Sequence, residues 1–183
     1  QTGIELATES TAKMAAMSKN SEPPDVIEAS LRLNATPAQV YRAVTSQNEL
    51  RKWWAPRVIM SRILVAQEQD RLMEMRLMQS EKYHLVRYSW RGQDWPPEVE
   101  PTTITFRIDD LGASRSKTGE GLLLEVSHDG WASGEERARQ AEIWKKALQV
   151  LELLLAGKKF KPWWETAESR SGYQQVKLTS LKP

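Results

Sequence analysis

The sequence predicts an α+β domain in which a curved, six-stranded antiparallel sheet grips a long C-terminal helix, with two short helices after the first strand. Three observations predict this arrangement. Short segments with one apolar and one polar face recur between residues 26 and 128, helix-start signals follow the first of them, and a broad helical stripe of apolar residues lies at 135–156. A sheet with one apolar face must bury it, and the long helix is the element that can cover it.

The first strand and the two short helices lie at the start of the domain. Apolar residues alternate with polar ones over 26–33, which is the period of a half-buried strand. Thr36 can cap a helix, and Pro37 suits the first turn, where no N–H group is needed. Ser46 and Glu49 have the spacing of a capping box, so we expect a second short helix to begin there.

Five further strands are expected before the long helix. In each of them apolar side chains occupy alternate positions, so one face of the sheet is apolar and the other is polar. This alternation is typical of an antiparallel sheet that packs on one side only. The five apolar sets run from Ile59 to Val65, Met73 to Leu77, Val86 to Trp90, Ile104 to Ile108, and Leu122 to Val126.

The long helix is expected over residues 135–156. Ser133 and Glu136 form a capping box at its start, and Gly157 is a natural stop. Between them apolar residues recur at three- and four-residue spacing, which gives the helix a broad face for the sheet. A helix of this length spans about 33 Å, so it can lie across the whole sheet.

Composition indicates one globular domain with polar ends. The 183 residues carry a net charge of +2, contain no cysteine and include no apolar run long enough to span a membrane. We therefore expect no disulfide, no nucleic-acid binding, no membrane span and a cytoplasmic protein. Residues 1–25 form a polar leader with four acidic residues and two lysines, residues 26–157 form the domain, and residues 158–183 form a basic tail with six basic and two acidic residues.

Five sequence segments resemble a known family. They occur in the family's order, and each lies on the element expected for it. The segments run from Ala35 to Thr45, Leu50 to Trp54, Leu85 to Trp90, Thr103 to Phe106, and Val126 to Trp131. On these segments, residues 26–156 resemble the bacterial proteins called activator of heat-shock-protein-90 ATPase homologue-like, within the START-like (SRPBCC) superfamily. The resemblance implies the START-like helix-grip fold, in which sheet and helix surround an apolar cavity.

The aromatic content favours a ligand in such a cavity. The chain has eight tryptophans, and some fall on inward faces beside methionines, whose side chains adapt to irregular shapes. We therefore expect non-enzymatic binding of a small hydrophobic or aromatic molecule in an internal cavity. The alternative is that these side chains fill the core. The expected ligand-binding residues are Trp53, Met73, Met75, Tyr88, Trp90, Phe106, His128, Trp144 and Leu148, with Trp95 on a proline-rich loop at the mouth.

A cyclase- or hydrolase-type enzyme, as the superfamily contains elsewhere, is one alternative. The only two histidines, His84 and His128, are both expected on inward faces. Two strand spacings would separate them by about 10 Å, which is too far for a shared metal, so either would act alone. We find no catalytic set, metal-ligand cluster or cofactor motif beside them, and we expect no cofactor and no metal.

A protein-interaction role is the other alternative. The resemblance to the eukaryotic activator suggests chaperone regulation, although the separate chaperone-binding domain of that protein has no counterpart in this chain. The best candidate contact is the start of the basic tail, from Lys158 to Trp164, which combines lysines with aromatic residues.

Overall fold

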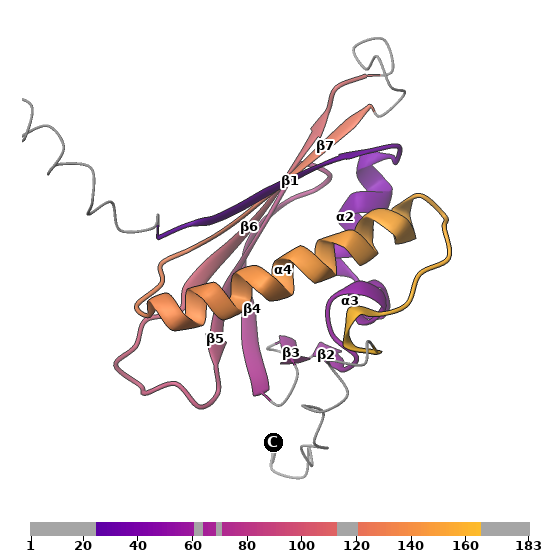
Figure 1. Ribbon diagram of the computed structural model, residues 1–183. Helices are drawn as coiled ribbons and strands as arrows, with labels where there is room; N and C mark the ends of the chain where they lie inside the picture. Colours follow the sequence, from indigo (N-terminus) through magenta and orange to yellow (C-terminus); the bar gives the residue numbers. More distant parts are fainter. Residues whose placement is uncertain (1–24, 61–63, 69–70, 113–120, 166–183) are drawn as a thin grey trace, which may run out of the picture.

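The fold is described from a computed structural model of the chain, shown in Figure 1. The structure describes residues 25–60, 64–68, 71–112 and 121–165. Almost all of the expected leader and most of the expected tail lie outside the described residues. In the part of the chain that the structure describes, no helix is both long and apolar enough to cross a membrane.

One antiparallel sheet with seven strands runs through the described residues, in the order β1-β7-β6-β5-β4-β3-β2. The α+β helix-grip class is thereby confirmed. The strands are β1 (Ile27–Leu33), β2 (Val58–Met60), β3 (Leu64–Glu68), β4 (Arg71–Glu81), β5 (Leu85–Gly92), β6 (Thr102–Asp110) and β7 (Leu122–Asp129).

The expected count of six strands was wrong because the segment from Ile59 to Val65 belongs to two strands. Val58 of β2 lies opposite Ala66 of β3, and Met60 lies opposite Leu64. One long strand and two short strands paired with each other give the same alternation of apolar and polar residues. The pattern therefore identifies strand residues here, but not the number of strands.

Three helices occupy the expected positions: α2 (Pro37–Thr45), α3 (Gln47–Trp53) and α4 (Gly134–Leu155). Thr36 and Gln39 form a reciprocal capping box on α2. The capping box expected at Ser46 was wrong, because Ser46 makes no side-chain cap bond and the Glu49 carboxylate contacts Lys52 instead.

The helix α4 begins and ends within one residue of the expected bounds, 135 and 156. The side chain of Ser133 accepts a hydrogen bond from the backbone N–H of Glu136. Only this half of the expected capping box is present, because the Glu136 carboxylate bonds to Arg71 instead. Gly157 has a positive φ of 66°, and the Gly157 and Lys158 N–H groups bond back to the carbonyls of Leu154 and Leu153. This pair of bonds is a Schellman motif, which satisfies the last carbonyl groups of a helix and favours glycine.

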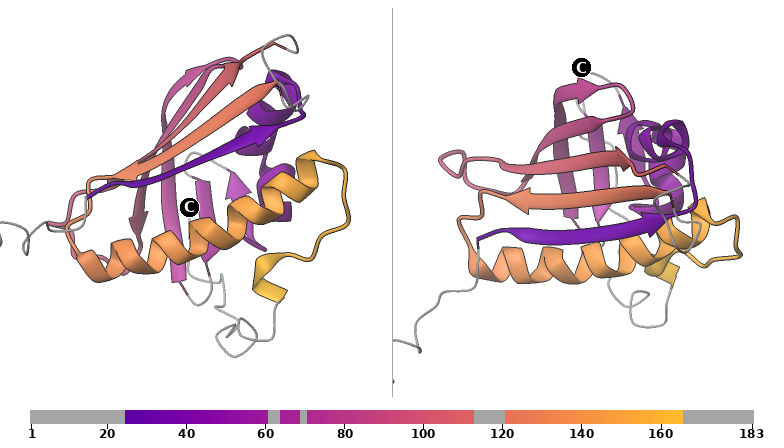
Figure 2. Two further views of the ribbon diagram at one scale, coloured as in Figure 1. Left: turned by 45° about the horizontal axis from the view of Figure 1, so that its top comes forward. Right: turned by 90° about the horizontal axis from the view of Figure 1, so that it is seen from above.

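The sheet curves around one side of α4 (Figure 1). In Figure 2, β1 and β7 run nearly along the helix, whereas β4 runs across it, and α2 and α3 lie beside its C-terminal half. Alternate residues of β5, β6 and β7 point to the helix and are buried. The core therefore lies between the curved sheet and the three helices, as the one-sided strand pattern predicts.

The first residues of the expected tail pack on this core. A short 3-10 helix, η2 (Trp163–Glu165), follows α4, and Trp163 is 3% exposed. Its indole Nε1 donates to the carbonyl oxygen of Trp54 over 3.0 Å. Phe160 and Trp164 are half-buried beside it. The packed body thus extends beyond Gly157 to the end of the described residues.

Replacing Trp163 by alanine should lower the free energy of unfolding by about 3–5 kcal/mol, the usual cost of removing a buried tryptophan side chain. Urea unfolding measures it. Trp164→Ala is the matched control, because Trp164 is half-buried in the same short helix, and it should cost less than half as much. Equal losses in the two variants would show that Trp163 is not part of the core.

Candidate functional site

The ten expected ligand-binding residues come together between the sheet and α4. Nine of them are at most 4% exposed, and the tenth, Trp95, is half-buried. The aromatic rings in and around this set form two groups. One group is the deep cluster, defined as Trp53, Trp54, Phe106 and Trp144, and the other is the Trp90 end, defined as Trp90, Trp95 and Trp131.

The deep cluster is filled by its own rings. The ring centroids of Trp54 and Trp144 are 5.3 Å apart, those of Trp53 and Trp54 are 5.8 Å apart, and those of Phe106 and Trp144 are 5.9 Å apart. These separations are those of aromatic pairs in direct contact. In this part of the interior the side chains act as core, which was the alternative to a cavity.

Polar atoms beside the deep cluster are bonded to the backbone of α2. Trp53 Nε1 donates to the carbonyl of Ala43, and the Tyr88 hydroxyl donates to the carbonyl of Val44, each over 2.9 Å. Burial raises the pKa of Tyr88, and the nearby Tyr41 adds to this effect, so the hydroxyl keeps its proton. Both groups therefore anchor α2 to the sheet and have no free donor for a ligand.

His128 connects α4 to three strands through a chain of hydrogen bonds. Trp144 Nε1 donates to His128 Nδ1 over 3.0 Å, and His128 Nε2 lies 2.7 Å from Thr102 Oγ1. The Thr102 hydroxyl donates to the carbonyl oxygen of Trp90 over 2.9 Å. An indole N–H can only donate, so Nδ1 is the acceptor and the ring proton lies on Nε2. Both ring nitrogens are thus satisfied by protein groups.

This environment keeps His128 neutral. The side chain is 0% exposed, and burial lowers its pKa to about 3. A general base needs a nitrogen within reach of a substrate and a pKa near the working pH. His128 has neither, because Trp144 and Thr102 occupy its two nitrogens. The contacts therefore favour a structural role for this residue.

The inward placement expected for His84 was wrong. His84 lies in the turn between β4 and β5, and it is exposed. The preceding residue, Tyr83, has a positive φ of 70°, a left-handed conformation that is uncommon outside glycine. Because the chain reverses at this point, the alternation of β5 cannot be extended back to residue 84. The two histidines do not share a site.

The Trp90 end is covered by rings from two loops. The ring of Trp90 meets that of Trp95 edge-on at 5.4 Å and that of Trp131 at 5.5 Å. Trp95 and Trp131 are both half-buried. Arg91 holds the first loop in place, since its Nη2 donates to the carbonyls of Trp95 and Pro96. Trp95 therefore lies over Trp90 as a cover.

Gly92 allows the first loop to close. A Cβ at this position would lie 2.6 Å from Asp94 Oδ1 and 2.7 Å from Trp95 Cδ1. Only a residue without a side chain permits both approaches. Gly92 thereby brings Asp94 toward Arg71 and Trp95 toward Trp90.

A charged cluster that the sequence did not indicate borders this end. Arg71 Nη1 donates to both carboxylate oxygens of Glu136, over 2.8 and 2.7 Å, and Arg71 Nη2 donates to Asp94 over 3.0 Å. Burial alone would lower the pKa of Arg71, but the bonds to Glu136 and Asp94 raise it above its ordinary value. The cluster ties the first turn of α4 to the start of β4 and to the loop after β5.

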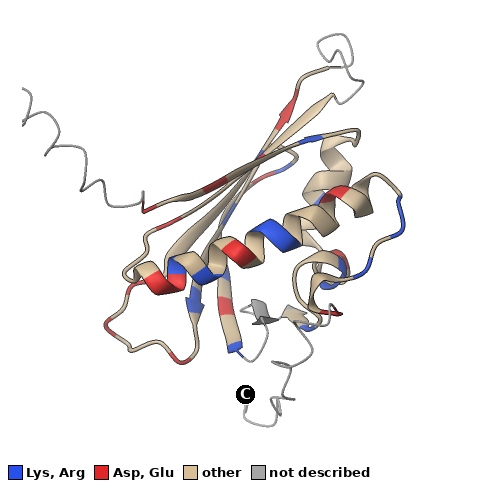
Figure 3. Ribbon diagram, in the orientation of Figure 1, with Lys and Arg blue, Asp and Glu red and all other residues tan. Residues whose placement is uncertain are grey.

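Charges elsewhere are mixed in sign. Figure 3 shows lysine and arginine interspersed with aspartate and glutamate along α4 and over the strands. The described residues contain no group of three or more histidine, aspartate or glutamate side chains placed to hold a metal ion.

Comparison with known proteins identifies the family. Residues 34–156 match the family described as Activator of Hsp90 ATPase homolog 1-like protein. The chain belongs to this family. The match covers the three helices and every strand of the sheet except β1, from residue 34 to residue 156, which confirms the resemblance inferred from the sequence.

Solved structures of similar fold support the same architecture. The solution structure of the Aha1 dimer from Colwellia psychrerythraea matches with a TM-score of 0.61 and 17% identity over 71% of this chain and 95% of that one. Protein MLL2253 from Mesorhizobium loti matches with a TM-score of 0.58 and 15% identity over 74% and 99%. Protein CV1439 from Chromobacterium violaceum matches with a TM-score of 0.55 and 20% identity over 73% and 98%. A search of curated proteins found no match.

The buried neutral His128 should make the protein less stable in mild acid. In the unfolded chain the ring takes up a proton below its ordinary pKa of about 6.5, whereas in the folded protein it stays neutral down to about 3. Its contribution to stability is therefore complete above the ordinary pKa and decreases as the pH falls through this window, by roughly 1 kcal/mol per pH unit.

Urea unfolding at a series of pH values, compared with His128→Gln, measures this dependence. The variant loses the hydrogen bonds but has no titrating ring, so its stability should change less with pH than that of the wild type. Parallel pH profiles for the two proteins would contradict a neutral buried His128.

Proposed function

We propose that the protein binds a small hydrophobic or aromatic molecule at the Trp90 end, without transforming it. The observation that carries this proposal is the contrast between the two ends of the interior. The rings of the deep cluster pack on one another and are buried, whereas Trp90 is covered by half-buried rings on loops. A ligand ring can take the place of a loop ring without disturbing the rest of the core.

The side chains around Trp90 suit such a ligand. Met73 and Met75 of β4 are buried beside it, and Met75 lies opposite Trp90 in the sheet. Methionine adapts its shape to what it contacts. An aromatic pair such as Trp90 and Trp95 contributes only about 0.5–1.5 kcal/mol beyond its buried area, so a bound ring can replace that contact. Family membership supports the proposal. The chain resembles proteins of the START-like fold, and this resemblance implies an apolar binding site between the sheet and the long helix.

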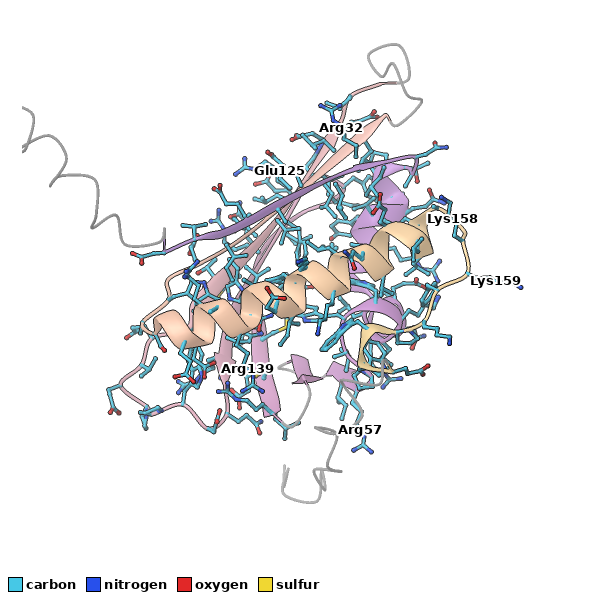
Figure 4. All side chains as sticks on the ribbon, in the orientation of Figure 1. Arg32, Arg57, Glu125, Arg139, Lys158 and Lys159 are labelled. Atoms are coloured by element: carbon cyan, nitrogen blue, oxygen red, sulfur yellow. The ribbon has the colours of Figure 1, made fainter. Side chains whose placement is uncertain are left out.

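A protein contact through the segment from Lys158 to Trp164 receives less support. The aromatic side chains of this segment are already used by the domain, since Trp163 is buried and Phe160 and Trp164 are half-buried on its core. Figure 4 shows Lys158 and Lys159 beyond the end of α4, where they are exposed. Two exposed lysines alone do not define a partner.

Truncating the cover should improve binding. In Trp95→Ala the ligand no longer competes with a ring for Trp90, so we expect an affinity up to about tenfold higher, equivalent to the roughly 1 kcal/mol of a lost aromatic pair. Tryptophan fluorescence titrated with a panel of aromatic hydrocarbons, aromatic ketones and fatty acids measures it. Trp164→Ala, at the opposite end of α4, should bind like the wild type. The proposal fails if no compound of the panel binds, or if both variants change the affinity equally.

A further inference from the structure

Two buried donors at the Trp90 end have no hydrogen-bond partner. Among the described residues, the buried side-chain nitrogen and oxygen atoms without a partner are Arg71 Nε and Trp90 Nε1. Buried polar groups are nearly always paired, so each such group in a folded protein needs an explanation. The buried indoles of Trp53, Trp144 and Trp163, by contrast, donate to a backbone carbonyl or to His128.

Both residues line one small cavity. It lies between the start of β4, the end of β5 and the first turns of α4, and its lining consists of Arg71, Met73, Trp90, Glu136, Arg139 and Gln140. Its volume is about 10 Å³, close to the smallest space that holds one water molecule. Arg139, labelled in Figure 4, belongs to the first half of α4. The cavity therefore has room for a single oxygen atom.

The two donors are held in place by their neighbours. The guanidinium of Arg71 is fixed by its bonds to Glu136 and Asp94. The ring of Trp90 is fixed by that of His128, whose centroid lies 5.0 Å away. Because these contacts exist without a ligand, the donors are preorganised, which is how binding sites avoid the cost of ordering polar groups.

The charges around the cavity favour a neutral acceptor. Arg71 and Arg139 are balanced by Glu136 and Asp94, so the surroundings carry no net charge to compensate a buried anion. Two N–H donors require an acceptor, and a carbonyl oxygen accepts two hydrogen bonds through its two lone pairs.

We propose that Trp90 Nε1 and Arg71 Nε together bind one carbonyl oxygen of the ligand, so that the ligand class is an aromatic ketone, quinone or amide. This inference rests on the proposed function, because the aromatic part of the same molecule lies on Trp90. Without a ligand, a water molecule fits the same donors, and the carbonyl oxygen replaces it.

Fluorenone and fluorene are a matched pair of probes, because they share their ring system and differ in the carbonyl group. We expect fluorenone to bind the wild-type protein about tenfold more tightly than fluorene. Trp90→Phe keeps an aromatic ring and removes the N–H, and Arg71→Lys keeps the charge beside Glu136 and Asp94 and removes Nε. Each should reduce the difference between the probes, while Trp164→Phe should leave it unchanged. Calorimetric or fluorescence titration of each protein with each probe measures this difference in affinity.

The wild-type protein alone provides a second measurement, which applies even if a variant fails to fold. In NMR spectra the indole N–H signal of Trp90 should move downfield on addition of fluorenone and not of fluorene. If both probes bind equally, the proposed function stands and the carbonyl site is wrong. If neither probe binds, the proposed function and the carbonyl site are both wrong. Tighter binding of fluorene carboxylate than of fluorenone would overturn the preference for a neutral acceptor.

Discussion

The hydrogen-bond chain from Trp144 through His128 and Thr102 to the carbonyl of Trp90 is the interaction on which the arrangement of the interior depends. It joins α4 to β7, β6 and β5 in one line. Apolar packing holds a helix on a sheet without fixing its position along the strands, whereas directional bonds between buried groups specify one position. The bond from the indole to Nδ1 forms only when the imidazole is neutral, and burial ensures this.

The same chain of bonds separates the two parts of the interior. At one end it orients Trp144, whose ring packs against Trp54 and Phe106 and completes the deep cluster. At the other end it orients the backbone at Trp90, while the His128 ring packs on the Trp90 ring. The indole N–H of Trp90 takes no part in this network and has no hydrogen-bond partner. The filled core and the candidate binding end are thus consequences of one set of contacts.

Much of this arrangement could be predicted from the sequence, because alternation within a strand is a local property. Trp90, Phe106 and His128 face inward as predicted, and α4 lies between its serine cap and Gly157. Predictions failed where the chain turns. His84 precedes β5 across a turn, and the segment after Pro56 divides into two strands, so in both cases a continuous pattern was extended past the end of an element. The contact between Arg71 and Glu136 joins residues 65 positions apart, and only the curvature of the sheet brings them together.

The protonation state of His128 can be observed directly by nitrogen NMR of the imidazole ring in the folded protein. We expect the neutral form with the proton on Nε2, unchanged as the pH falls well below the ordinary histidine pKa of about 6.5. That result would confirm that Trp144 donates to Nδ1 and that the ring serves as a structural link. A ring that carries its proton on Nδ1, or that titrates near its ordinary pKa while the protein stays folded, would contradict the hydrogen-bond chain and the division of the interior that follows from it.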